Sequence, residues 1–352
     1  MKRSEIISIK INLGYEVKDF ESGILVENIP FKQFKHNLLI SGLGASEKSA
    51  VLSYIFNQIY EKVPEIGVLL IKLRANKNSY LYHLNKVYEY GKPELEIPYF
   101  LEHGSSDVNR GQLVCCLNAL FGFHYEMRWV MGSVIRHYKV GHFPSSLVDY
   151  LEDVKNYLIV NPYAKKFNES NIKNVEKAIE LVQNDPILNR ILWLSLFLPE
   201  WLKFWGEGKK VLIDLSSCEP FYQKMLVTLL FQNIVQLIPT KESDMPSGIV
   251  VLEDADHIFE ECPLESWRNN YNENKNYYNL QRDKNYFLTK EQLEQAYGDP
   301  NYLFKVQLKS IFRMLIIDEF RYRNISLITT CEDATKIYEY INSISELKIN
   351  LE

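Results

Sequence analysis

Short apolar runs alternate along this chain with longer stretches in which apolar residues recur at helical spacing. Each run is long enough for a buried strand and too short for a helix. The expected strands are residues 37–41, 68–73, 211–215, 249–252 and 325–330. Helices are expected at 50–62, 219–237 and 301–322. Strands that alternate with helices predict an α/β fold, because two neighbouring parallel strands need a long crossover between them.

The chain divides into four segments around these elements. They are a short β-rich lead-in (1–30), the first part of an α/β core (31–110), a helical insertion or subdomain (111–206) and the second part of the core (207–352). Within the last segment, residues 263–300 are rich in asparagine, tyrosine and lysine and show little apolar periodicity. Such a composition buries too little apolar surface to fix a structure, so we expect a mobile surface loop there.

Composition narrows the class of protein without naming a function. Of 352 residues, 46% are hydrophobic and 24% charged, which is typical of a globular protein. A net charge of -5 argues against a surface that binds nucleic acid over its whole extent, although a local basic channel stays open. The five cysteines form no C-x-x-C pair, so we expect no zinc site.

The same sequence predicts a cytoplasmic protein that does not enter a membrane. No apolar run approaches the ~20 residues that a membrane helix needs. The first residues, Met-Lys-Arg-Ser-Glu, lead into an alternating pattern and lack the continuous apolar stretch of a secretory signal. Cysteines in a cytoplasm are ordinarily reduced thiols, which fits this expectation.

The strand at 37–41 leads into a candidate phosphate-binding loop at Gly42–Ser49. Seven of its eight positions match the pattern G-x-x-x-x-G-K-[ST], and Glu47 stands at the second glycine. The pattern binds ATP through backbone N–H groups at a helix N-terminus, a lysine charge and a hydroxyl on Mg²⁺. The expected nucleotide-binding residues are Gly42, Gly44, Ala45, Ser46, Glu47, Lys48 and Ser49, and Ser49 also contacts Mg²⁺. The alternative is a strand-to-helix turn that binds no ligand.

A second candidate feature is the strand at 249–252, which ends in two adjacent carboxylates. We expect Glu253 to hold Mg²⁺ through water and Asp254 to orient or deprotonate an attacking water. Asp214, at the end of another strand, is a competing metal carboxylate that the sequence leaves open. His257 follows the acidic pair, and we expect it to pack against the protein rather than to contact phosphate.

The order of these motifs resembles the ATPase core of HerA, FtsK and conjugation-type motor proteins, over roughly residues 24–345. The motifs are the phosphate loop, Val-Leu-Ile-Asp-Leu-Ser, Val-Val-Leu-Glu-Asp-Ala-Asp-His, and Asp-Glu-Phe-Arg-Tyr-Arg-Asn-Ile-Ser-Leu-Ile-Thr-Thr-Cys. The resemblance implies an α/β fold of the P-loop NTPase (RecA-like) type, a parallel sheet flanked by helices. It also implies Mg-ATP as ligand, a hexameric ring and action on double-stranded DNA.

In that family, an arginine in the last motif reaches the nucleotide of the neighbouring subunit. Arg321 matches this arginine, and Arg323 is the second choice. A guanidinium can stabilise charge that develops on a transferred phosphoryl group. The implied catalytic set is therefore Lys48, Asp254 and Arg321. The alternative for either arginine is a solvated basic residue after a helix.

Four residues depart from the family pattern, and all four fall on motifs that face the nucleotide. They are Glu47, Lys72, Asp318 and Cys331. The departures suggest a second function, a scaffold that does not hydrolyse ATP and assembles with a partner protein such as a nuclease. A signalling or defence-system ATPase is a third reading. The lead-in is also shorter than the N-terminal barrel of HerA-like proteins, which puts barrel-mediated ring assembly in question.

Overall fold

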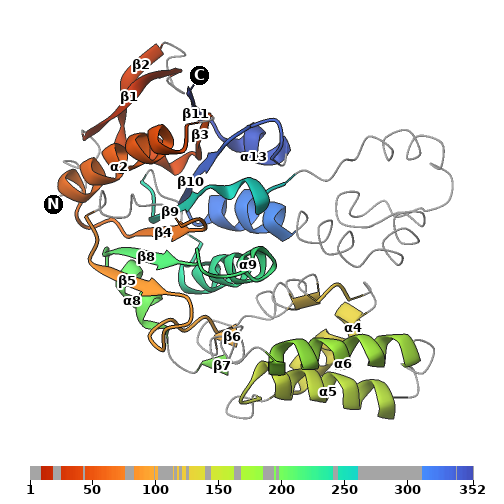
Figure 1. Cartoon of the computed structure of the whole chain (residues 1–352). Helices are drawn as coiled ribbons and strands as arrows, with labels where there is room; N and C mark the ends of the chain where they lie inside the picture. The colour runs from red at the N-terminus through yellow and green to blue at the C-terminus, as the bar shows by residue number, and fades with distance from the viewer. Residues whose placement is uncertain are drawn as a thin grey trace.

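The computed structural model describes most of the chain and is drawn in Figure 1. The described residues are 9–18, 25–42, 44–75, 83–98, 100–101, 114, 117–118, 121–123, 127–138, 144–161, 168–184, 194–195, 198–240, 245–260, 311–337 and 339–351. The mobile loop expected at 263–300 lies outside them.

The centre of the molecule is a seven-stranded sheet in which every pair of neighbouring strands is parallel. In spatial order its strands are β11 (Leu347–Leu351), β3 (Leu38–Gly42), β10 (Ile325–Cys331), β9 (Gly248–Glu253), β4 (Val68–Lys72), β8 (Lys210–Asp214) and β5 (Lys86–Glu89). All five strands expected from the sequence are present, which confirms the predicted fold class. The two edge strands, β5 and β11, were not predicted.

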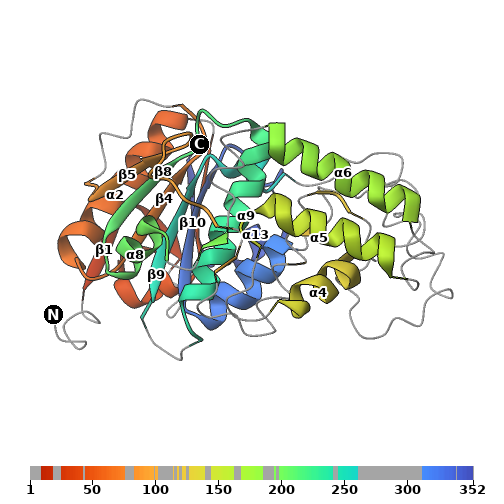
Figure 2. The same cartoon turned by 90° about the horizontal axis from the view of Figure 1, so that it is seen from below.

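Helices cover both faces of this sheet, and each face has its own apolar cluster. Helix α2 (Ala45–Lys62) lies on one face and helix α9 (Pro220–Leu237) on the other (Figure 2). In β4, Val68 and Leu70 pack into the α2 cluster, whereas Leu69 and Ile71 pack into the α9 cluster. Successive side chains of a strand point to opposite faces, so a strand buried on both sides reads as one continuous apolar run.

Shorter elements complete the two layers. An antiparallel hairpin of β1 (Lys10–Lys18) and β2 (Leu25–Pro30) packs beside α2, which fits the expected β-rich lead-in. The α9 layer includes α8 (Glu200–Gly206) and a wide helical turn, η5 (Met314–Phe320). Two short 3₁₀ turns, η1 (Phe31–Lys35) and η4 (Ala255–His257), and one helix, α13 (Glu339–Ile344), connect the strands.

Three helices from the middle of the chain lie together beyond α9 (Figure 1, Figure 2). They are α4 (Met127–His137), α5 (Leu147–Val160) and α6 (Asn168–Asn184), and α5 packs against both neighbours. Two short parallel strands, β6 (Phe100–Leu101) and β7 (Leu194–Ser195), pair nearby. Among the described residues, no helix has the length and apolar character that crossing a bilayer requires.

The parallel topology gathers the chemically distinctive residues at one edge of the sheet. Strands β3, β10, β9 and β4 are neighbours and end at Gly42, Cys331, Glu253 and Lys72. In open α/β sheets, ligands bind outside the carboxyl ends of the strands. The phosphate loop and the acidic strand end therefore lie at the edge where this architecture places binding sites.

Candidate functional site

The candidate loop begins at Gly42, a position that only glycine can occupy. Its φ angle is +149°, in the range that residues with a side chain rarely adopt. A Cβ atom there would also lie 2.3 Å from the carbonyl oxygen of Leu351, because β11 pairs with β3 in that register. The edge strand thus fixes where the loop leaves the sheet.

Helix α2 starts within the loop, at Ala45, with Gly44 as its N-cap and no side chain capping it. The first backbone N–H groups of a helix have no partner within the helix, and together with the helix dipole they attract anions. The helix thus begins within the predicted nucleotide-binding residues, at Ala45 and Ser46. Leu43 lies outside the described residues.

Glu47 occupies the third position of α2, and its carboxylate folds back over the loop. A Cβ atom placed on Gly44 would lie 2.8 Å from Oε2 of Glu47. A carboxylate at this position suits a helix N-terminus, because it interacts favourably with the dipole and can reach the first N–H groups. The carboxylate of Glu47 thus lies against Gly44, and because the residue is exposed its side chain can turn away.

Lys48 points into the protein rather than into solvent. Only 1% of it is exposed, and Nζ donates a hydrogen bond of 2.6 Å to the carbonyl oxygen of Gly42. The ammonium group is therefore held at the mouth of the loop, where it has a backbone partner in place of a phosphate oxygen.

Ser49 contacts Glu253 directly, which joins the phosphate loop to the acidic strand end. The hydroxyl of Ser49 donates a 2.8 Å hydrogen bond to Oε1 of Glu253, and both residues are buried. A hydroxyl and a carboxylate oxygen are the kinds of group that hold Mg²⁺, directly or through water, so the donor set fits this ion.

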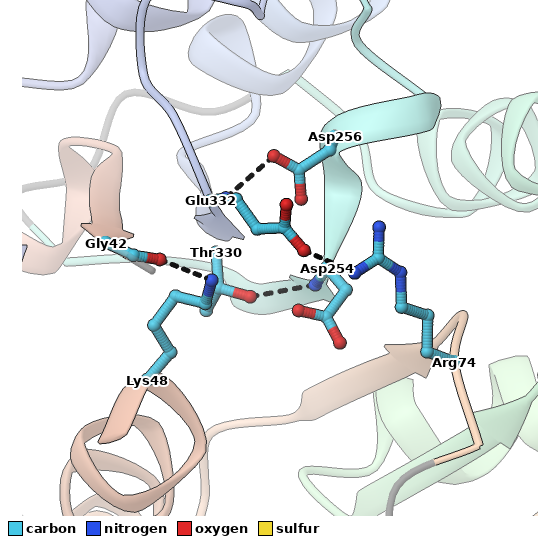
Figure 3. Close-up of polar contacts among 7 residues, drawn as sticks. All are labelled: Gly42, Lys48, Arg74, Asp254, Asp256, Thr330 and Glu332. Atoms are coloured by element: carbon cyan, nitrogen blue, oxygen red, sulfur yellow. Dashed lines mark hydrogen bonds and ion pairs between the residues drawn. The ribbon is translucent and has the colours of Figure 1, made fainter. Parts of the chain in front are cut away.

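Asp254 adopts an unusual backbone conformation for a residue with a side chain, with φ +56° and ψ +51°. Its N–H donates a 2.8 Å hydrogen bond to Oγ1 of Thr330, at the end of β10. Its carboxylate lies between Lys48 and Arg74 (Figure 3). Burial raises the pKa of this carboxyl group, and the charges of Arg74 and Lys48 partly offset that effect.

Three charged residues beside Asp254 were not identified from the sequence. Arg74, two residues beyond β4, bonds through Nη1 to Oε1 of Glu332 at 2.7 Å (Figure 3). The N–H of Glu332 donates to Oδ1 of Asp256 at 2.7 Å. The segments that follow β4, β9 and β10 are thereby tied together. The only sequence signal for these residues is that a charged residue follows a buried strand. This signal becomes informative only when the order of the strands in the sheet is known.

Asp214, the competing metal carboxylate, is engaged elsewhere. Lys72 stands opposite Asp214 on β8 and opposite Glu253 on β9, and its Nζ lies 3.4 Å from Oδ2 of Asp214. Ser49 contacts Glu253, so the carboxylate beside the phosphate loop belongs to β9. This placement favours Glu253 over Asp214 as the metal-binding residue.

Two further predicted positions lie at the same edge of the sheet. Cys331 is buried at the end of β10, and burial raises the pKa of its thiol to about 12, so the group stays protonated at neutral pH. His257 contacts Oε1 of Gln223 through Nε2 at 2.6 Å, and burial lowers its pKa to about 4. His257 thus packs against Gln223 in the described part of the chain.

The candidate arginines lie at the opposite end of the sheet. Arg321 is exposed just before β10, a strand of seven residues, and so lies roughly 20 Å along the strand direction from the phosphate-loop edge. It lines a cavity of about 210 Å³ together with His36 and Glu346. Arg323 is buried, donates to the carbonyl oxygen of Val235 and pairs with Glu319. Asp318, near Arg321, is also remote from the loop.

Comparisons with known proteins agree with this architecture. No protein-family model matches the chain, and a search of the curated proteins found no match. Several solved structures resemble it, and two of them have a TM-score of 0.50. One is VirB4 of Thermoanaerobacter pseudethanolicus, with 12% identity, covering 96% of this chain and 84% of that one. The other is the bacterial conjugative coupling protein TrwBdeltaN70, with 10% identity over 91% and 68%. The fold is thus the RecA-like α/β fold of P-loop ATPases.

Proposed function

We propose that this chain binds Mg-ATP at the loop Gly42–Ser49 and hydrolyses it. The contact between Ser49 and Glu253 carries the proposal, because it brings together the hydroxyl of the loop and the carboxylate of the strand, the two groups that hold Mg²⁺ in such a site. Lys48 is buried beside this pair, and Asp254 is the residue directly after Glu253. A turn that binds no ligand would have no need of a buried ammonium group beside two buried carboxyl groups.

Each residue then has a role that its position permits. The N–H groups at the start of α2 and the ammonium of Lys48 bind phosphate oxygens. Ser49 would supply an oxygen ligand for Mg²⁺ and Glu253 would hold the ion through water, and the ion would neutralise charge on the phosphates. Asp254 orients the attacking water or accepts its proton, a task that its raised pKa favours.

The proposal extends to an oligomer that acts on DNA. Arg321 lies at the far end of its own sheet, so it can reach a nucleotide only in a neighbouring copy, as in a hexameric ring. TrwBdeltaN70, which shares the fold, is described as a conjugative coupling protein. We infer that the chain is a translocase subunit that moves double-stranded DNA. Its cytoplasmic location stays a prediction.

A second candidate function is a scaffold that binds nucleotide weakly and assembles with a partner such as a nuclease. The carboxylate of Glu47 over Gly44 favours it, because negative charge there opposes polyphosphate. The bond from Lys48 to Gly42 favours it as well, because that bond has to break before phosphate can replace the carbonyl.

Calorimetric titration with Mg-ATP separates the two functions. The wild type is expected to bind Mg-ATP. Lys48→Ala should bind it ~10- to 150-fold more weakly, because the variant loses one charge-assisted hydrogen bond. Glu47→Gly is expected to bind more tightly than the wild type. Lys177→Ala removes an exposed lysine on α6 and serves as the matched control, with unchanged affinity.

Two outcomes would decide against ATP hydrolysis at this loop. A wild type without detectable heat at ~1 mM nucleotide binds more weakly than about -4 kcal/mol and favours the scaffold. Recovery of binding in Glu47→Gly would then locate the defect. If the wild type binds, DNA-stimulated ATP turnover is measured next. Equal turnover in Lys48→Ala would rule out the assigned site.

A further inference from the structure

Arg74 is a cation at the candidate site to which the proposed function has given no task. It leaves the end of β4 and points toward Asp254 from the side opposite Lys48 (Figure 3). Its side chain is 45% exposed and that of Glu332 is 48% exposed, whereas Lys48 is buried. Arg74 therefore stands at the entrance of the site, where it can move without disturbing the core.

Within the described part of the chain, the Arg74 guanidinium donates a hydrogen bond to Glu332. A guanidinium has five N–H donors arranged as a fork, so this contact leaves most of them available. An ion pair between exposed side chains adds little to stability, because water and side-chain entropy offset the attraction. The contact is thus a weak one that a better acceptor can replace.

The charge of Arg74 already acts on the carboxyl groups around it. Burial raises the pKa of Asp254, and the charge of Arg74 opposes this rise, ahead of that of Lys48. The hydrogen bond from Arg74, together with its charge, lowers the pKa of Glu332. Asp256 also faces Arg74. Arg74 and Lys48 thus flank Asp254 on its two sides. If Lys48 binds the inner part of a polyphosphate, a second cation beyond Asp254 lies toward its outer end.

We propose that Arg74 binds the terminal phosphate of ATP from within the same chain, and that Glu332 holds it in place until the nucleotide arrives. This inference rests on the proposed function. The planar guanidinium can donate two parallel hydrogen bonds to two oxygens of one phosphate. Such bidentate bonds are stronger than an ion pair with an exposed carboxylate. Binding of ATP therefore exchanges one partner of Arg74 for another and releases Glu332.

The exchange gives the nucleotide a way to act on the neighbouring strands. Glu332 directly follows β10, and its backbone N–H holds Asp256 in the segment after β9. Its carboxylate links Glu332 to Arg74, two residues beyond β4. ADP lacks the terminal phosphate, so Arg74 returns to Glu332 when only the diphosphate is bound.

The test compares affinities for Mg-ATP and Mg-ADP by calorimetry in four variants. Arg74→Ala is expected to weaken ATP binding ~10- to 150-fold and to leave ADP binding nearly unchanged. Arg74→Lys keeps the charge but loses the forked set of donors. Its ATP affinity should therefore lie between that of the wild type and that of Arg74→Ala. Glu332→Gln removes the competing carboxylate and is expected to raise ATP affinity ~1.5- to 5-fold. In Arg74→Ala with Glu332→Gln this gain disappears.

A merely structural ion pair predicts a different pattern. Arg74→Ala and Glu332→Gln would then lower the melting temperature alike and change ATP and ADP affinity in the same direction, a result that would overturn the inference. Circular dichroism and thermal unfolding confirm that each variant folds, and Lys177→Ala again serves as the control. If the wild type binds neither nucleotide, the proposed function fails and the inference with it. If the wild type prefers ATP and Arg74→Ala keeps that preference, the inference alone fails.

Discussion

At the scale of single residues, the candidate site combines features that are costly for stability. Asp254 adopts a left-handed backbone conformation that residues with a side chain seldom take, and its carboxyl group is buried. Neither feature improves packing, and a residue such as glycine or asparagine would relieve part of the cost. Costs of this kind concentrate at functional sites, where the geometry serves chemistry.

The raised pKa of Asp254 gives a prediction on pH and stability. Because burial raises this pKa above 3.8, the folded state holds the proton more tightly than the unfolded state. The free energy of unfolding therefore falls as pH rises from 3.8 through the folded-state value. Asp254→Asn removes the ionisation and tolerates the left-handed conformation. We expect the variant to be more stable than the wild type at pH 7, with a difference that shrinks toward pH 4.

Urea unfolding at pH 7, 5.5 and 4 measures this difference, with Asp153→Asn on helix α5 as an exposed carboxylate for comparison. The variant should also bind Mg-ATP while losing its turnover. A difference that stays constant across the three pH values would contradict the assigned burial cost.

The sequence predicted some of these residues and missed others for a physical reason. Lys48, Ser49, Glu253 and Asp254 follow from local patterns, a loop before a helix and carboxylates after a strand, and the structure places them together. Arg74 carries no local pattern. Its importance depends on β4 lying beside β9, which is set by strand order and not by neighbouring residues. The roles of all these residues stay predictions.

At the scale of elements, the apolar strands were predicted well because both faces of the sheet are covered. The edge strands were missed for the opposite reason. In β11 buried and exposed residues alternate, and β5 has only four residues, so neither forms a continuous apolar run. Helix α2 begins at Ala45 rather than at residue 50, because the loop sequence itself forms the first helical turn. Single sequences seldom fix such ends.

One buried lysine holds the connection between α2 and β4. Nζ of Lys210 donates to carbonyl oxygens of this connection, at 2.9 Å from Pro64 and 2.8 Å from Ile66. It also reaches the carbonyl oxygens of Val63 and Gly208 at longer distances. Burial lowers its pKa to about 8, so the bonds offset a real cost of burying the charge.

We predict that Lys210→Met destabilises the protein by about 2–4 kcal/mol, because methionine fills the space but leaves buried carbonyl oxygens without a donor. Urea unfolding, with the slope compared between variants, measures this loss. Lys209→Met removes the adjacent, exposed lysine and should change stability by less than about 0.5 kcal/mol. Equal effects of the two substitutions would show that the carbonyl bonds contribute little.

At the scale of the whole molecule, the sheet has two chemically different ends. The carboxyl ends of the strands hold the candidate nucleotide site, and Arg321 is exposed beyond the amino end of β10. One copy cannot bring both to one nucleotide. If Arg321 acts in hydrolysis, two copies meet through unlike surfaces, and such a contact closes into a ring or extends as a filament.

Mixing two inactive variants tests this arrangement. Lys48→Ala lacks the phosphate-binding lysine, and Arg321→Ala lacks the arginine, so each alone is expected to have background turnover. In an equal mixture, a working interface needs an intact loop from one copy and an intact arginine from the next. With random assembly, about one quarter of the interfaces meet both conditions, so about one quarter of wild-type ATP turnover should return.

The complementation is measured as DNA-stimulated phosphate release over a series of mixing ratios, where turnover should peak near equal amounts. Arg321→Ala should still bind Mg-ATP with wild-type affinity, because the arginine contacts the nucleotide of another copy. Full turnover of Arg321→Ala alone would show that this arginine is not required. Background turnover at every ratio, with both variants assembled, would show that the loop and the arginine do not meet across an interface.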